Sequence, residues 1–179
     1  RGRGLPRRAR SARHAAAPMK KRTYVYLGEE KPTLANLITA TKEGKTFGTS
    51  GPLMLVTLGG RVPGHVFTAD GAERNLHVKA FAPGADYTSR SQQPYLDRIE
   101  ILRNGETWKS IDLGGQKSLE HEISETIQEQ ETAWYIIKVF GSGNRQVAIS
   151  SPFYFRADGF KPPEPITANA HIQIIDAQT

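Results

Sequence analysis

Most of the chain alternates apolar and polar residues with the two-residue period of β-strands. After residue 52, short runs of this kind follow one another, and turn dipeptides such as Asn104-Gly105 separate them. The runs cover residues 53–58, 62–68, 76–82, 98–103, 108–113, 120–127, 133–140, 146–150 and 152–156. Their regular spacing predicts a mainly β fold, an antiparallel β-sandwich of Ig-like type. Residues 133–140 are apolar on both faces apart from Lys138, which predicts a central strand with Trp134 in the core.

One short strand and one helix precede the sandwich. Residues 23–27 (TYVYL) are aromatic and β-branched, which predicts a strand. Apolar or semi-apolar residues then recur at the i, i+3, i+4, i+7 spacing of a helix, at Leu34, Leu37, Ile38 and Thr41. The spacing predicts one α-helix over residues 33–43, with Thr33 as its N-cap and Gly44 just past its C-terminus.

The composition divides the chain into four parts. Residues 1–22 are rich in Arg and Ala with almost no large apolar side chain, and they are expected to be a disordered basic tail. Residues 23–52 form the strand, helix and turn, and residues 53–156 form the sandwich. Residues 157–179 are a Pro-rich extension, in which 170–176 (AHIQIID) alternate again and form a candidate edge strand.

The positive charge of the chain belongs to the tail. The formal net charge is +6, yet residues 1–22 hold nine Lys or Arg, which leaves 15 basic and 18 acidic residues elsewhere. The tail fits a nucleic-acid-binding arm, a transit-like peptide or sequence without a role. No aromatic residue interleaves its arginines, so nucleic acid is not the expected partner. No apolar run approaches the ~20 residues that cross a bilayer, so we expect a soluble protein without a membrane partner, in an undetermined compartment.

Catalytic and metal-binding patterns are missing from the sequence. It has no cysteine, and none of its histidines (His14, His65, His77, His121 and His171) forms an H-x-H pair or lies three or four residues from another. Ser50 lies outside any G-x-S-x-G elbow. The acidic residues Glu120, Glu122, Glu125, Glu129 and Glu131 lack the alternation of a calcium loop and are expected to line a solvated strand edge. We therefore predict no catalytic and no metal-binding residue in this chain.

Three aromatic residues suggest an alternative function. Tyr87, Tyr95 and Trp108 fall in or beside expected loops, where a flat ligand such as a sugar could stack on them. On this hypothesis the chain is a stand-alone β-sandwich module that binds carbohydrate without turning it over.

Three stretches together resemble a known family. Residues 33–64, which contain GKTFGTSGP at 44–52, are followed by LDRIEILRNGE at 96–106 and by the strands within 133–155. In order and spacing they are similar to the C-terminal region of CehA/McbA-type metallohydrolases of the PHP (polymerase and histidinol phosphatase) superfamily. In that family the helix and turn follow the last part of a (β/α)-barrel, and a β-sandwich follows them.

The resemblance implies a parent enzyme that hydrolyses a phosphoester or carboxyl ester with metal-activated water. Its divalent metal (Mn, Zn or Fe) would be held by His and Asp/Glu of the barrel, including an H-x-H pair that this chain lacks. Whether this chain is itself an enzyme is left open, and alone we expect it to be inactive.

The expected partner is the catalytic barrel, with self-association through an apolar patch on the helix and on residues 23–27 as a consequence of its absence. The resemblance also implies that one turn packs against the barrel or lines its mouth. The residues of this turn are Thr46, Thr49, Ser50, Gly51 and Pro52.

Overall fold

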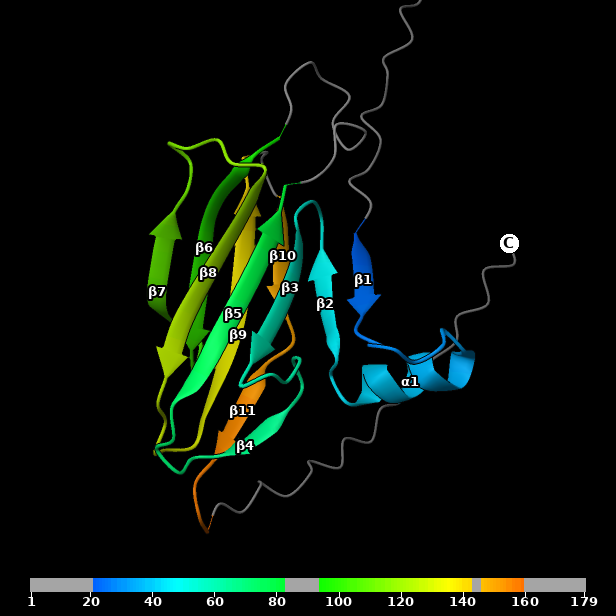
Figure 1. Ribbon diagram of the computed structural model, residues 1–179, viewed down its shortest axis with the longest axis vertical. Helices are drawn as coiled ribbons and strands as arrows, with labels where there is room; N and C mark the ends of the chain where they lie inside the picture. The colour runs from blue at the N-terminus through cyan, green and yellow to red at the C-terminus, as the bar shows by residue number, and fades with distance from the viewer. Residues whose placement is uncertain (1–20, 83–93, 143–145, 160–179) are drawn as a thin grey trace, which may run out of the picture.

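Strands make up most of the structure, which confirms the prediction of a mainly β fold. The computed structural model of the 179-residue chain describes residues 21–82, 94–142 and 146–159, and Figure 1 shows its arrangement. In chain order the elements are β1 (Arg22–Val25), α1 (Leu34–Lys42), β2 (Thr46–Thr49), β3 (Leu53–Leu58), β4 (Val66–Thr68), β5 (Arg74–Phe81), β6 (Leu96–Arg103), β7 (Glu106–Asp112), β8 (Glu120–Ile127), β9 (Ala133–Gly141), β10 (Val147–Ser150) and β11 (Phe153–Arg156).

The described strands form two sheets. The larger has eight strands and is centred on β9, which pairs with β6 along one edge and with β10 and then β11 along the other. From β9 the sheet continues through β6 to β7, through β10 to β2 and β1, and through β11 to β4. The smaller sheet has the order β3-β5-β8. Among these strands only β11 and β4 pair in parallel.

The two sheets face each other and enclose one apolar core (Figure 1). Because side chains alternate between the faces of a strand, every second residue points into this core. The smaller sheet contributes Met54, Val56, Leu58, Leu76, Val78 and Ala80, and the larger contributes Ile99, Ile101, Tyr135, Ile137, Val139, Phe153 and Phe155. The structure is therefore a sandwich, whereas its Ig-like character stays a prediction. β9 is central as expected, but Trp134 lies half-buried on its outer face and Tyr135 takes the core position.

β1 and β2 join the larger sheet, with α1 between them in the sequence. β1 pairs antiparallel with β2, and β2 pairs with β10, so no break in the sheet marks the domain boundary expected at residue 52. The expected turn at 44–52 contains strand β2, because Thr46-Phe47 and Thr49 have the β-branched and aromatic character that suits a strand. β1 starts at Arg22, inside the segment expected to be tail.

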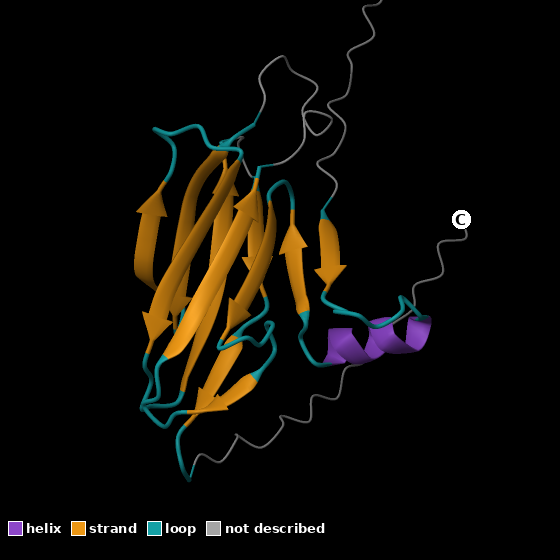
Figure 2. Ribbon diagram, viewed as in Figure 1, coloured by secondary structure: helices purple, strands orange, loops and turns teal. Residues whose placement is uncertain are grey.

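The helix begins and ends where its sequence predicts. The Thr33 side chain accepts a hydrogen bond from the Asn36 amide at 3.2 Å, and Gly44 follows the helix with a φ of +72°. Figure 2 shows the helix standing at the end of β1 and β2, beside the sandwich. Ala40 is the one helical residue that is buried. The sandwich therefore covers little of the helix.

The C-terminal end of α1 is held by a close approach of two loops. Gly64 donates its amide to the Pro152 carbonyl at 2.8 Å, between β10 and β11. A Cβ added to Gly64 would lie 1.9 Å from the Glu43 carbonyl oxygen, and Gly64 has a φ of +89°. Only glycine fits there, and this contact links the helix end to the larger sheet.

Gly64→Ala should lower the free energy of unfolding by at least about 2 kcal/mol, because both the backbone angle and the contact with Glu43 oppose a side chain. Gly60→Ala is the matched control, since Gly60 has a φ of +73° but nothing within 4 Å of an added Cβ. Urea unfolding of both variants separates the cost of the positive φ, which both positions share, from the cost of the contact with Glu43, which only Gly64 makes. Equal losses would contradict the close contact at Gly64.

Several sequence expectations lie outside the described residues. They are the tail up to residue 20, the candidate edge strand at 170–176 and Tyr87. Within the described parts of the chain, no helix is long and apolar enough to cross a membrane.

Candidate functional site

The turn between β2 and β3 gathers the polar residues singled out in the sequence. The buried Thr49 hydroxyl donates to the Pro52 carbonyl oxygen and accepts from the Gly51 amide at 2.9 Å. These two bonds close the turn from within. The Thr49 hydroxyl therefore serves the backbone of its own turn.

Ser50 and Thr46 bind the strand edge beside the turn. The Ser50 amide donates to the Val147 carbonyl at 2.9 Å, and the Ser50 hydroxyl accepts from the Val147 amide at 3.1 Å. The Thr46 and Ser151 hydroxyls share a hydrogen bond of 2.8 Å. All three hydroxyls of the turn are thus engaged in hydrogen bonds within the fold.

Gly51 and Pro52 are buried, and a Cβ on Gly51 would meet the Gln146 side chain at 3.0 Å. On the solvent side, the turn borders a shallow hollow of about 430 Å³ over β1, β2 and β10. The hollow is lined by Lys21, Arg22, Thr23, Gly48, Thr49, Ser50, Val147 and Ile149. Of the predicted turn residues, Thr49 and Ser50 therefore line this surface hollow.

Thr49→Val should destabilise the protein by about 1–3 kcal/mol, because the buried Pro52 carbonyl and Gly51 amide would each lose a partner. Thr49→Ser keeps the hydroxyl and should cost much less. Urea unfolding of the two variants measures the difference. A Thr49→Val protein as stable as the Ser variant would show that the hydroxyl does not support the turn.

Of the aromatic residues proposed for ligand stacking, the structure describes Trp108 and Tyr95, and it does not bring these two together. Trp108 is 45% exposed on β7, near the turn that joins β7 to β6, and its ring meets Tyr135 edge-on at 6.1 Å. Tyr95 precedes the opposite end of β6 and is half-buried. With about 3.4 Å per residue along a strand, the two rings lie roughly 20 Å apart along the hairpin. Trp108 alone presents an exposed ring there.

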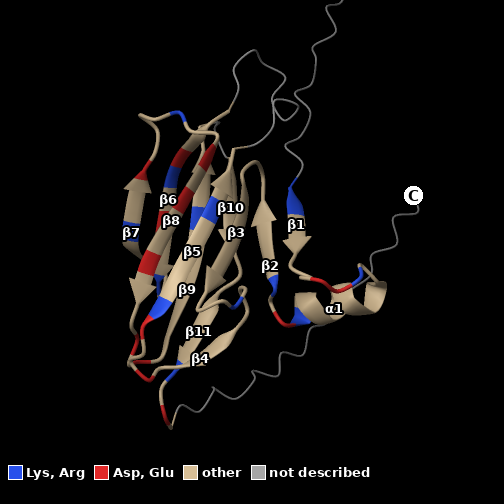
Figure 3. Cartoon of the chain, viewed as in Figure 1, with Lys and Arg blue, Asp and Glu red and all other residues tan. Residues whose placement is uncertain are grey.

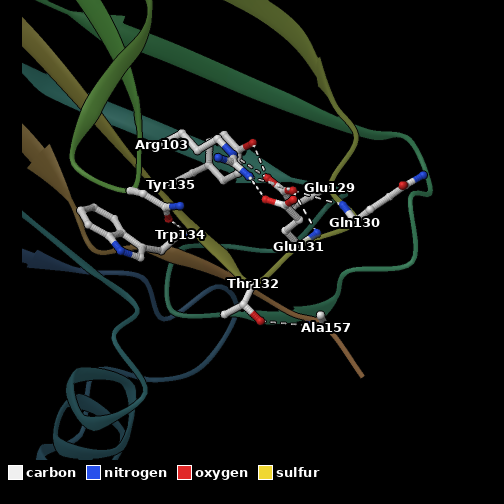
Figure 4. Close-up of polar contacts among 9 residues, drawn as sticks. Arg103, Glu129, Gln130, Glu131, Thr132, Trp134, Tyr135 and Ala157 are labelled. Carbon is white, nitrogen blue, oxygen red and sulfur yellow. Dashed lines mark hydrogen bonds and ion pairs between the residues drawn. The ribbon is translucent and has the colours of Figure 1, made fainter. Parts of the chain in front are cut away.

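A polar network around Glu129 was not expected from the sequence (Figure 4). Glu129 is only 5% exposed, so its assignment to a solvated strand edge is wrong. Its carboxylate accepts two hydrogen bonds from Arg103, at 2.7 and 3.1 Å, and one from the Tyr135 hydroxyl at 3.0 Å. The amides of Gln130 and Glu131 donate to it at 3.1 Å.

The electrostatics of this network favour the ionised carboxylate. Burial acts to raise the pKa of Glu129, but the hydrogen bonds from Arg103, the Glu131 amide and Tyr135 outweigh it and lower that pKa. Burial and the bond to Glu129 raise the pKa of Tyr135 to about 12. Every partner is thus held in one protonation state near neutral pH, which suits a structural clamp on the β8–β9 loop.

Glu129→Gln should destabilise the protein by about 2–3 kcal/mol near pH 7, because Arg103 would lose its buried partner. Since the folded-state pKa is lowered, the contribution is complete above the unfolded value of about 4.3 and is lost as the pH falls through the folded value. Urea unfolding at about pH 7 and about pH 3 measures this contribution. The difference in free energy of unfolding between Glu129→Gln and the wild type should therefore be smaller at about pH 3.

The exposed Glu131, which lies 3.5 Å from Arg103, supplies the matched control. Glu131→Gln should change stability by less than about 0.5 kcal/mol. If Glu129→Gln lowered the free energy of unfolding equally at both pH values, the role of the ionised carboxylate would be contradicted.

The other acidic residues of this region pair with neighbouring basic side chains. Glu120 lies 2.7 Å from Lys79, Glu122 lies 2.7 Å from His77, and Glu125 lies 2.6 Å from Lys109. In the part of the chain that the structure describes, no three His, Asp or Glu side chains gather to hold a metal ion. The divalent metal that the family resemblance implies is expected on the catalytic barrel and not on these carboxylates, which bind neighbouring basic side chains.

Apolar side chains reach solvent on the side of the molecule that carries α1. Figure 3 shows charges concentrated on β5, β6 and β8, whereas β3 and most of α1 carry few. On the helix Leu34 is 74% and Ile38 is 47% exposed. Together with the half-buried Leu37 they form what we call the helix surface.

A second apolar area lies between β1 and β3. It is a groove of about 240 Å³, lined by Tyr24, Val25, Tyr26, Phe47, Leu53, Met54, Leu55 and Phe81. We call it the β3 groove. The turn, the helix surface and the β3 groove are the candidate contact regions of the molecule.

No protein-family model, curated protein or solved structure matches this chain significantly.

Proposed function

We propose that the chain is an accessory β-sandwich domain of a PHP-type metal-dependent hydrolase. It docks on the catalytic barrel through the helix surface and performs no turnover alone. The observation that carries this proposal is α1, whose exposed Leu34 and Ile38 lie on a helix with one buried residue.

The helix is too short to be explained by its own stability. Nine-residue helices are marginal in water, and helices in proteins gain most of their stability from packing an apolar face. Here the capping residues define the helix ends, yet Leu34 and Ile38 pack against little of the sandwich. Covering two such side chains contributes about 1.5–3 kcal/mol each. A partner over the helix surface would supply this stabilisation.

The proposed partner follows from the family resemblance. In CehA/McbA-type proteins the corresponding helix and turn adjoin the barrel, so the barrel is the body that would cover Leu34 and Ile38. The hydroxyls of Thr46, Thr49 and Ser50 are engaged in the fold, which supports a contact role for this region over a chemical one. In this proposal, the rim of the barrel contacts the hollow beside the turn.

A stand-alone carbohydrate-binding module is the second candidate. The exposed ring of Trp108 favours it, because an indole face can stack on a sugar. It has less support, since Tyr95 lies at the far end of the same hairpin and a single ring makes a weak platform.

The test is binding to the catalytic barrel of a CehA/McbA-type hydrolase prepared without its own C-terminal sandwich. The chain should form a one-to-one complex by calorimetry, and Leu34→Gln/Ile38→Gln should weaken it at least about 100-fold, because the buried apolar area is lost. Leu119→Gln alters a side chain that is 48% exposed outside the helix and should leave affinity unchanged.

Binding that ignores the helix variant, or no binding, would contradict the docking proposal. The chain alone, supplied with Mn²⁺ or Zn²⁺, should hydrolyse neither phosphoesters nor carboxyl esters. Turnover with stoichiometric metal would contradict the accessory role itself.

A further inference from the structure

The loop between β3 and β4 borders a hollow of about 450 Å³ beside the C-terminal end of α1. The hollow is lined by residues 60–66 and by Glu43 and Lys45, which precede β2. Gly64 joins these two parts of the lining, because its backbone lies against the Glu43 carbonyl and its amide donates to the Pro152 carbonyl at 2.8 Å. Backbone contacts therefore fix the shape of the hollow.

Positive charge exceeds negative charge in this lining. Lys45 and Arg61 are basic, and Glu43 is the one carboxylate among the residues that line the hollow. The Lys45 ammonium lies 2.6 Å from the Glu43 carboxylate, so these two charges balance each other. The Arg61 side chain is exposed and makes no ion pair in the part of the chain that the structure describes. The hollow thus presents a guanidinium whose charge no carboxylate balances.

His65 lies in the same lining, near further positive charge. Its half-buried ring meets Phe67 edge-on at 4.5 Å. Partial burial, and then the charges of Arg61 and Arg74, lower the pKa of His65. Asp70 lies 2.9 Å from Arg74 and balances that guanidinium. The His65 ring is therefore mainly neutral near pH 7, and a negative charge in the hollow would favour its protonation.

The Val62 amide is a further donor in the lining. Arg61 turns both of its backbone groups toward Leu58, and backbone groups alternate in direction along an extended chain, so the Val62 amide points away from Leu58. Val62 is half-buried, and its amide has no hydrogen-bond partner among the described residues. A partly buried amide without a partner costs free energy, which an oxygen atom of a ligand would recover.

We propose that this hollow binds a small oxyanion of the phosphate class. Arg61 donates charge-assisted hydrogen bonds to it, and the Val62 amide and the protonated His65 ring are the other donors. A guanidinium, a ring and an amide suit the four oxygens of a tetrahedral anion better than the two oxygens of a carboxylate. Glu43 and the negative end of α1 oppose the anion, which keeps its affinity low.

Sulfate is the probe, because it has the tetrahedral oxygens of phosphate and keeps one charge state through the titration range of histidine. NMR titrations of the unaltered chain compare sodium sulfate with sodium chloride at equal ionic strength. The pKa of His65 should be at least about 0.5 higher in sulfate, and by reciprocity sulfate should bind about threefold more tightly once His65 is protonated. The Val62 amide signal should shift with sulfate. Equal pKa values of His65 in the two salts would overturn the proposal.

Three variants locate the site. Arg61→Gln should weaken sulfate binding at least about tenfold, because the main donor is lost. Glu43→Gln should tighten binding, because the opposing carboxylate is removed. Lys117→Gln is the control matched in charge, since Lys117 is exposed in the β7–β8 loop outside the hollow, and it should leave the affinity unchanged. A loss in Arg61→Gln no larger than in Lys117→Gln would show an effect of net charge alone and would overturn the proposal.

Two other anions test the chemical class of the ligand. Inorganic phosphate should displace sulfate, and sodium acetate should bind more weakly than either. Acetate that binds as tightly as sulfate, or phosphate that fails to displace it, would overturn the assignment to the phosphate class. All of these measurements use the chain by itself, so their outcome is independent of whether it docks on a barrel.

Discussion

The arrangement of the molecule depends on one strand edge of β9 that two strands share. β10 and β11 pair with successive parts of it, and Pro152 between them lacks the amide needed to continue the ladder. From this break one branch leads through β10 to β2 and β1, and the other leads through β11 to β4. The Pro152 carbonyl also accepts the Gly64 amide, so the position of α1 follows from the same interruption.

The polar groups of the structure mostly serve the fold. Thr49 closes its turn, Ser50 joins β10, and Glu129 ties Arg103 and Tyr135 to the loop before β9. In each case the group binds backbone atoms or an ion-pair partner at close range.

The two apolar regions beside β1, the helix surface and the edge of β3, differ in how far other residues cover them. Leu34 and Ile38 are exposed on α1, whereas Tyr26 and Arg61 make hydrogen bonds to the edge of β3. Blocking β3 removes an unselective contact that any extended strand could make. The helix surface is a different kind of contact, because its side chains present a shape that a specific partner can complement. A domain that docks at one place benefits from this difference.

Features that depend on neighbouring residues were readable from the sequence. The period of two, the turn dipeptides and the Thr33 and Gly44 caps act within a few residues, so they determine the strands and the ends of α1 locally. Features that depend on distant partners are not readable from the sequence. It predicts a turn where β2 pairs with β10, and a solvated strand edge where Glu129 is buried. Trp134 and Tyr135 show the same limit, because both are aromatic and only the register with β6 and β11 decides which one enters the core. Long-range contacts bury the Glu129 carboxylate, set which face of β9 enters the core and bring Tyr26 to the edge of β3. Only the tertiary structure decides these contacts.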